Sequence, residues 1–160
     1  MYKMPFVSLP PLVDRGFTVI GESPIQGKGV FALKFIPQGT RLFEYTGFKM
    51  KYDDLFEDYI QGKSSMRYVI NLDDEYIIDG ERGGNDSRYI NHSCDPNCEV
   101  YFLNDTIFIY ANLDIETGTE LSFDYQLGLL FEENEIIEKI KKWNPCNCGS
   151  PKCRGTMMLL

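Results

Sequence analysis

The chain has 160 residues, of which 43% are hydrophobic, and it carries a formal net charge of −8 at pH 7. This length and composition predict one globular domain with a buried core. The negative charge disfavours nonspecific nucleic-acid binding and suits a basic protein partner instead. No run of ~18 apolar residues predicts a membrane span, and neither end resembles a signal peptide, so we expect an intracellular location.

The N-terminal half is predicted to contain short strands and one helix. Residues 1–14 are expected to form an arm, because its prolines oppose a regular helix. A helix is predicted over 52–60, where apolar residues recur at helical spacing before Gly62 ends it. The strands predicted in this half are 17–20, 30–33, 40–46 and a hairpin of 68–72 with 75–79.

The C-terminal half continues this pattern. Its predicted elements are a loop over 80–85, a hairpin of 100–103 with 106–110, a strand over 121–125 and an amphipathic helix over 131–143. The helix is acidic at its start and basic at its end, as the helix dipole favours. No repeat or linker divides the chain. The sequence therefore predicts a mostly β fold with minor α content.

One polar segment, RYINHSCDPNC over residues 88–98, contains the only histidine of the chain. Its Asp-Pro-Asn run favours a turn, so Asn91, His92 and Cys94 are expected just before a sharp bend, where a strand ends and can face a ligand. A plain polar turn is the simpler interpretation of this segment alone. The later segments LSFDY and CNCGSPKC favour a functional interpretation.

Three of the five cysteines form a C-x-C-x4-C pattern at Cys146, Cys148 and Cys153. A structural zinc site needs four ligands, commonly thiolates or imidazoles. Disulfides are the alternative, but a chain without a secretory signal disfavours them. We therefore predict a zinc ion whose fourth ligand comes from far upstream. The candidates for that ligand are Cys94, Cys98 and His92.

A glycine-rich turn, GKGVF over residues 27–31, precedes a predicted strand. Its two glycines allow a backbone to approach a ligand closely, although a simple turn explains the motif equally well. It is not a dinucleotide-binding fingerprint, because the third glycine and the following helix are missing.

Together, the ordered motifs GKGVF, EYTG, RYINHSCDPNC, GTELSFDYQ and CNCGSPKCRG resemble those of SET-domain protein lysine methyltransferases that carry a post-SET zinc segment. The resemblance covers about residues 17–156. It implies a SET-domain fold of small curved sheets with a pseudoknot. It also divides the chain into an arm (1–14), a SET domain (15–127) and a helix with the post-SET zinc segment (128–160).

The resemblance implies S-adenosylmethionine as methyl donor and a structural Zn²⁺. The implied donor-binding residues are Gly27, Lys28, Gly29, Val30, Tyr68, Arg88, Asn91, His92 and Tyr125. The implied catalytic residues are Tyr125, Tyr68 and Phe123, and the implied zinc ligands are Cys94, Cys146, Cys148 and Cys153, which leaves Cys98 unpaired. Phenylalanine at position 123 favours di- or trimethylation. Without the neighbouring motifs, core packing would explain these aromatic residues.

The chain departs from the family pattern at three positions. Phe48 stands where a glutamate is common after the EYTG segment, and Thr156 and Met157 stand where an aromatic residue commonly lies near the adenine. A methionine can cover an adenine face because its thioether is flexible and polarizable.

Several functions stay open on the sequence. The first is methylation of histone lysine, the second is lysine methylation of a non-histone protein, and the third is a catalytically silent SET-like binding module. A zinc-ribbon nucleic-acid binder fits the negative charge less well. We expect a basic, lysine-containing protein or peptide as partner, with a histone tail foremost, and neither a direct nucleic-acid site nor a membrane. The expected location is the nucleus for a eukaryotic or host-directed protein, and otherwise the cytoplasm.

Overall fold

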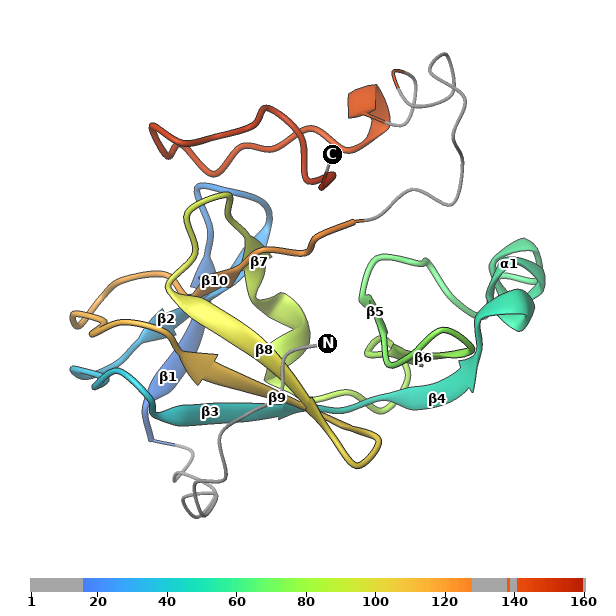
Figure 1. Cartoon of the computed structure of the whole chain (residues 1–160), viewed down its shortest axis with the longest axis horizontal. Coiled ribbons are helices and arrows are strands. Elements are labelled where there is room, and N and C mark those ends of the chain that lie inside the picture. The colour runs from blue at the N-terminus through green and yellow to red at the C-terminus, as the bar shows by residue number, and fades with distance from the viewer. Residues whose placement is uncertain (1–15, 128–137, 139–140, 160) are drawn as a thin grey trace.

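The computed structural model describes residues 16–127, 138 and 141–159, and it contains four small sheets (Figure 1). The predicted arm over 1–14 and most of the predicted helix over 131–143 lie outside the described residues. Within the described part of the chain, no helix is both long and apolar enough to cross a membrane.

The first sheet pairs β1 (Thr18–Glu22) with β2 (Lys28–Ala32) in antiparallel register. The turn between them is closed by the Ser23 N–H, which donates to the Gly27 carbonyl at 2.8 Å. Gly27 adopts a φ of +51°, a conformation that favours glycine. The glycine-rich turn is therefore a tight hairpin end that brings residues 23–28 to one edge of the molecule.

The central sheet has the order β3-β9-β8, formed by β3 (Arg41–Tyr45), β9 (Thr106–Ala111) and β8 (Cys98–Leu103). The hairpin predicted for β8 and β9 is confirmed. Asn104 and Asp105 at its tip both have positive φ, as a two-residue type I′ turn requires. The apolar face of β9 supplies the main core through Ile107 and Ile109.

A third sheet, β4-β6-β5, carries helix α1 (Figure 1). It is formed by β4 (Phe48–Lys51), β6 (Tyr76–Asp79) and β5 (Val69–Asn71), and α1 spans Tyr52–Ile60. The helix prediction is confirmed, and Leu55 anchors α1 in a small second core with Met50 and Ile77. Strand β4 was not predicted, because only Met50 in its four residues is buried.

The smallest sheet joins two functional motifs that lie 31 residues apart in the sequence. After a short 3₁₀ helix, η1 (Asp86–Tyr89), strand β7 (Asn91–His92) pairs in parallel with β10 (Ser122–Phe123). The strand predicted over 121–125 is therefore shorter than expected. This pairing brings the NHS and FDY segments together, and the predicted class of a mostly β fold with small sheets is confirmed.

Candidate functional site

Tyr125 directly follows the β7–β10 pair and lies in a cluster of aromatic side chains. Its hydroxyl donates to the Ile90 carbonyl at 2.8 Å, and its ring lies 4.9 Å from that of Phe123 and 5.3 Å from that of His92. Burial raises the pKa of the Tyr125 phenol, and the nearby Tyr68 raises it further. The phenol therefore stays protonated at neutral pH and acts as a fixed dipole.

A second phenol, that of Tyr45 on β3, extends the same aromatic cluster. Its hydroxyl donates to the Tyr68 carbonyl at 2.6 Å, and burial raises its pKa, with smaller contributions from Tyr125 and Asp79. Gly80 makes room for this arrangement, since a Cβ there would lie 2.7 Å from the Tyr45 hydroxyl oxygen. Three phenol rings therefore lie together, those of Tyr45, Tyr68 and Tyr125, and the Phe123 ring lies beside them.

Asn91 connects β7 to the glycine-rich turn. Its amide nitrogen lies within 3.2 Å of four acceptors, which are Ser23 Oγ, the Gln26 and Lys28 carbonyls, and Glu120 Oε1. An amide NH₂ group has two protons, so these acceptors compete for them. The second oxygen of Glu120, Oε2, is buried and has no hydrogen-bond partner among the described residues. The carboxylate places negative potential behind Asn91, which favours a cationic ligand there.

His92 is buried and links Tyr125 to a cysteine. Its Nδ1 accepts the Tyr125 backbone N–H at 3.1 Å, which fixes the remaining proton of the neutral ring on Nε2. That Nε2 lies 3.4 Å from Cys94 Sγ. Burial lowers the pKa of His92, and the nearby Arg154 lowers it as well, against the opposing effect of Asp124. The neutral imidazole is therefore a donor to the Cys94 sulfur.

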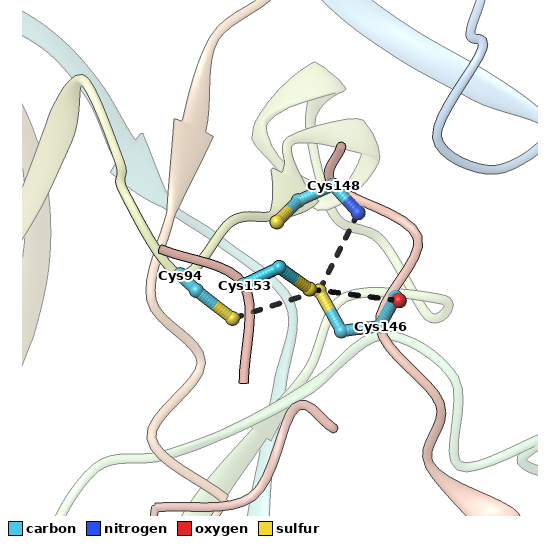
Figure 2. A group of neighbouring side chains, drawn as sticks. All are labelled: Cys94, Cys146, Cys148 and Cys153. Atoms are coloured by element: carbon cyan, nitrogen blue, oxygen red, sulfur yellow. Dashed lines mark hydrogen bonds between the residues drawn. The ribbon is translucent and has the colours of Figure 1, made fainter. Parts of the chain in front are cut away.

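The four cysteines Cys94, Cys146, Cys148 and Cys153 converge on one point, and their Sγ atoms all lie within 4.8 Å of one another (Figure 2). The Cys94 and Cys146 sulfurs are 3.7 Å apart, close to the edge of about 3.8 Å that a tetrahedral zinc–thiolate site has. Cys98, by contrast, is buried in the core with its sulfur near Asn97 Oδ1.

Backbone N–H groups surround these sulfurs. Three of them lie 3.4 Å from a sulfur: the Cys148 N–H from Cys146 Sγ, the Arg154 N–H from Cys94 Sγ, and the Gly155 N–H from Cys153 Sγ. Burial raises the pKa of the Cys94 and Cys146 thiols. The pKa of Cys148 is lowered to about 6, since hydrogen bonds to its sulfur outweigh the effect of burial. The donor set and its N–H groups therefore fit a zinc ion held by four thiolates.

A cleft lies between the glycine-rich turn, β7 and the C-terminal tail, here defined as residues 144–159. It is lined by Ile25, Gln26, Asn91, His92, Tyr125, Pro145, Cys146, Asn147 and Met157. The tail lies alongside the β7 and β10 region in Figure 1. It is attached there by the Cys94 contact and by a bridge between Leu127 and Met158. One wall of the cleft therefore depends on the docked tail.

Residues 27–126 match the family model described as SET domain. The chain belongs to the SET-domain family. Relatives of this SET domain include the histone-lysine N-methyltransferase trr of Drosophila melanogaster, which is 33% identical over 149 residues. That alignment covers 89% of this chain and 6% of the relative.

Two further relatives of the SET domain carry similar names. One is the H3 lysine-4 specific histone-lysine N-methyltransferase of Schizosaccharomyces pombe, 34% identical over 142 residues that cover 84% of this chain and 14% of the relative. The other is the human histone-lysine N-methyltransferase 2B, which is 33% identical over 139 residues. These residues cover 83% of this chain and 5% of the relative. The chain thus spans only a small part of these relatives. SET methyltransferases use S-adenosylmethionine.

The SET domain brings some of the predicted site residues together and places others apart. Asn91, His92 and Tyr125 line the cleft, and Tyr68 and Phe123 lie in the adjoining aromatic cluster. The other predicted donor-binding residues do not line the cleft; these are Gly27, Lys28, Gly29, Val30 and Arg88.

Four of these five residues have contacts that explain their positions. Gly29 admits the Glu120 carboxylate, since a Cβ there would lie 2.3 Å from Oε1, and Val30 is buried in the core. The Lys28 carbonyl lies 2.9 Å from the Asn91 amide nitrogen. Arg88 donates to the carbonyls of the loop that follows β6 and to the Tyr89 hydroxyl at 2.8 Å. Gly29 and Lys28 thus contact the residues around Asn91, whereas Val30 and Arg88 lie in the core and beside the loop after β6.

Several residues of the cleft and of the aromatic cluster were not predicted as site residues. Ile25, Gln26, Pro145 and Asn147 carry no chemical pattern that distinguishes them in a sequence, and Tyr45 appeared only as part of the EYTG motif. Met157, noted as a departure from the family pattern, lines the cleft.

The buried phenols predict a loss of stability in alkali. Folding raises the pKa values of Tyr45 and Tyr125. The stability that the two neutral phenols contribute to the fold is therefore fully present below the ordinary phenol pKa of about 10, and it is lost as the pH rises above that value. We expect the free energy of unfolding to fall by about 1.4 kcal/mol per pH unit for each such phenol in this range. Urea titrations at pH 8 to 11 measure this.

Tyr45→Phe should make that pH dependence shallower. Tyr52→Phe, which removes a phenol from the exposed side of α1, is the matched control and should leave the slope unchanged. Equal slopes for all three proteins would contradict the assignment.

Proposed function

We propose that this SET domain is a protein lysine N-methyltransferase that uses S-adenosylmethionine and acts on histone lysine. The observation that supports this most directly is the position of Tyr125, which lies at the meeting point of the cleft and the cluster of Tyr45, Tyr68 and Phe123. Such an arrangement separates a donor site from an aromatic channel for an alkylammonium group.

The cleft is the proposed donor site. S-adenosylmethionine, when bound, supplies a methyl group on a positively charged sulfur that leaves as a neutral thioether. Asn91 and the backbone of Ile25 and Gln26, just before the glycine-rich turn, would hold its amino acid part, with the Glu120 carboxylate adding negative potential beside Asn91. Met157 and Pro145 offer apolar surface to the adenine. Four cysteines would bind a structural zinc ion that keeps the tail docked as the cleft wall.

The aromatic cluster is the proposed lysine channel. A lysine amine has an ordinary pKa of about 10.4 and must lose a proton before it can attack a methyl group. Burial among aromatic rings disfavours the ammonium form and so promotes this loss. Tyr125 does not take the proton, because its phenol is itself protonated and donates to Ile90. Its role is to orient the amine and to accept weak C–H···O contacts from the methyl group.

Histones are the proposed substrates because the relatives are named histone-lysine N-methyltransferases and because the chain is acidic. Helix α1 alone contributes four acidic side chains, Asp53, Asp54, Glu57 and Asp58. Complementary charge speeds the association of a basic tail and orients it. A histone substrate places the enzyme on chromatin in the nucleus of a eukaryotic cell.

The test is to incubate the zinc-loaded chain with labelled S-adenosylmethionine and core histones, and to map modified lysines by mass spectrometry. We expect label on histone lysine, beginning with H3 because some relatives are named H3 lysine-4 specific. A parallel incubation with cell lysate detects a non-histone target. Donor binding by calorimetry without any transfer would favour a silent binding module, and absence of donor binding would reject the proposal.

The identity of residue 123 predicts the product. Phe123 is buried next to Tyr125 and brings no hydroxyl into the channel, which leaves room for an amine that already carries methyl groups. We expect Phe123→Tyr to shift the products from di- and trimethyl-lysine toward monomethyl-lysine. Phe102→Tyr, at an exposed position on β8, is the matched control. Mass spectra showing the same methyl distribution in both variants would reject this role.

A further inference from the structure

An arginine in the C-terminal tail reaches back to the segment that carries Tyr125. The Arg154 guanidinium donates two hydrogen bonds to Asp124, from Nη1 to Oδ2 at 2.8 Å and from Nη2 to Oδ1 at 2.9 Å. A bidentate pair of this kind fixes the relative orientation of both groups. The side chains are only 28% and 17% exposed, so water and salt screen the pair less than an ion pair on the open surface.

Asp124 stabilises the turn that follows Tyr125. Its Oδ1 also accepts the Gln126 backbone N–H at 3.0 Å, and Gln126 has a φ of +47°. A left-handed conformation is uncommon for a residue other than glycine and persists only where its surroundings hold it. Leu127, the next residue, forms a bridge with Met158 of the tail. The carboxylate therefore determines how the chain leaves Tyr125 and meets the tail.

Arg154 is attached to the cysteine cluster at its other end. It directly follows Cys153, and its backbone N–H donates to Cys94 Sγ at 3.4 Å. Together with His92, which contacts both Tyr125 and Cys94, the pair therefore connects the cysteine cluster to the residues on either side of Asp124, Phe123 and Tyr125.

We propose that Asp124 and Arg154 form a latch that positions Tyr125 against the tail wall of the cleft. They are positioning residues, since neither lines the cleft nor supplies a sulfur to the cluster. The inference depends on the proposed function for its kinetic consequence. Its structural consequence, a tail held in register with Tyr125, holds for any activity.

The chain offers a matched control ion pair in the same tail. Lys152, which precedes Cys153, donates to Asp95 Oδ1 at 2.8 Å, but these side chains are 73% and 45% exposed and neither lines the cleft. Exposed ion pairs contribute little to the free energy of folding. The latch variants are Arg154→Gln, Arg154→Lys, Asp124→Asn and the Arg154→Gln/Asp124→Asn double variant. The control variants are Lys152→Gln and Asp95→Asn.

We expect the latch variants to retain one zinc ion per chain while kcat falls and the KM for S-adenosylmethionine rises, with kcat/KM reduced about tenfold. Arg154→Lys should recover part of the loss, because it keeps the charge but not the bidentate geometry. The double variant should resemble the single variants, since both remove the same interaction. The control variants should change kcat/KM less than twofold.

Hydrogen exchange followed by mass spectrometry gives a readout that does not need activity. Amides over 125–127 and 156–159 should exchange faster in the latch variants than in the control variants, with zinc still bound. This readout separates failure of the latch from failure of the proposed function. The difference in exchange between latch and control variants would be seen even if the wild-type protein had no methyltransferase activity. Unchanged exchange in the latch variants, or loss of zinc from them, would overturn the inference.

Discussion

Replacing Cys94 by serine is expected to prevent the four-thiolate zinc binding proposed above and to abolish the proposed methyl transfer. Cys94 is the only member of the cysteine cluster that lies outside the C-terminal tail, so a zinc ion held by the four thiolates would join the tail to the β7 segment through its sulfur. Changing an outer-shell partner alone commonly costs 10- to 100-fold in metal affinity or activity, so we expect losing a ligand to cost at least about 100-fold. The tail should then leave the cleft and expose Met157 and Pro145.

The experiment compares Cys94→Ser with Cys98→Ser, a substitution of a cysteine four residues away. Cys98 is 1% exposed in the core, away from the cluster, so its variant should lose some stability but keep the metal. Zinc content by atomic absorption and donor affinity by calorimetry are the measurements. A Cys94→Ser protein that retained stoichiometric zinc would contradict the assigned ligand, and zinc loss from Cys98→Ser would point to the other cysteine.

Tyr125→Phe is expected to lower kcat by about 100-fold while the protein still folds and still binds its donor. The hydroxyl is fixed by Ile90, so it faces the reacting groups in one orientation without reorganisation during transfer. Its loss also removes one buried hydrogen bond, which costs about 1 kcal/mol of stability. The size of the kinetic effect follows from mutations that remove a single fixed dipole in other active sites, which cost 10²- to 10³-fold.

Tyr101→Phe provides the control for this experiment. The Tyr101 hydroxyl donates to Glu99 at 2.7 Å on the central sheet, outside the cleft, so its removal should leave kcat unchanged. Single-turnover kinetics separate the transfer step from binding and product release. If Tyr125→Phe retained the wild-type transfer rate, the channel would have to lie elsewhere.

The elements that the sequence predicted well are those with strong local signals. The β8–β9 hairpin follows from alternating apolar residues around Asn104-Asp105, and α1 follows from the helical spacing that Gly62 ends. Strand β4 lacked such a signal, because it is short and pairs only with a segment distant in the sequence.

The site was predictable to the extent that its chemistry is carried by distinctive residue types. The spacing of the three tail cysteines indicated a metal site but left its fourth ligand open among three residues, and the resemblance to a family favoured Cys94. The convergence of the sulfurs supports that choice. The Asp124–Arg154 pair was not predicted: both residues lie within quoted motifs, but neither was given a role, and 30 positions separate them in the sequence.

The docked tail also has a consequence for how the protein reaches its native state. The cleft combines residues near 25, 91, 125 and 146–157, so nearly every contact within it joins distant parts of the sequence. Such non-local topologies fold slowly, because chain entropy is lost before the contacts form. During synthesis the cleft cannot be completed until Met157 has emerged from the ribosome. The proposed zinc ion could join all four cysteines only at this stage, so zinc supply would act on the last step in building the cleft.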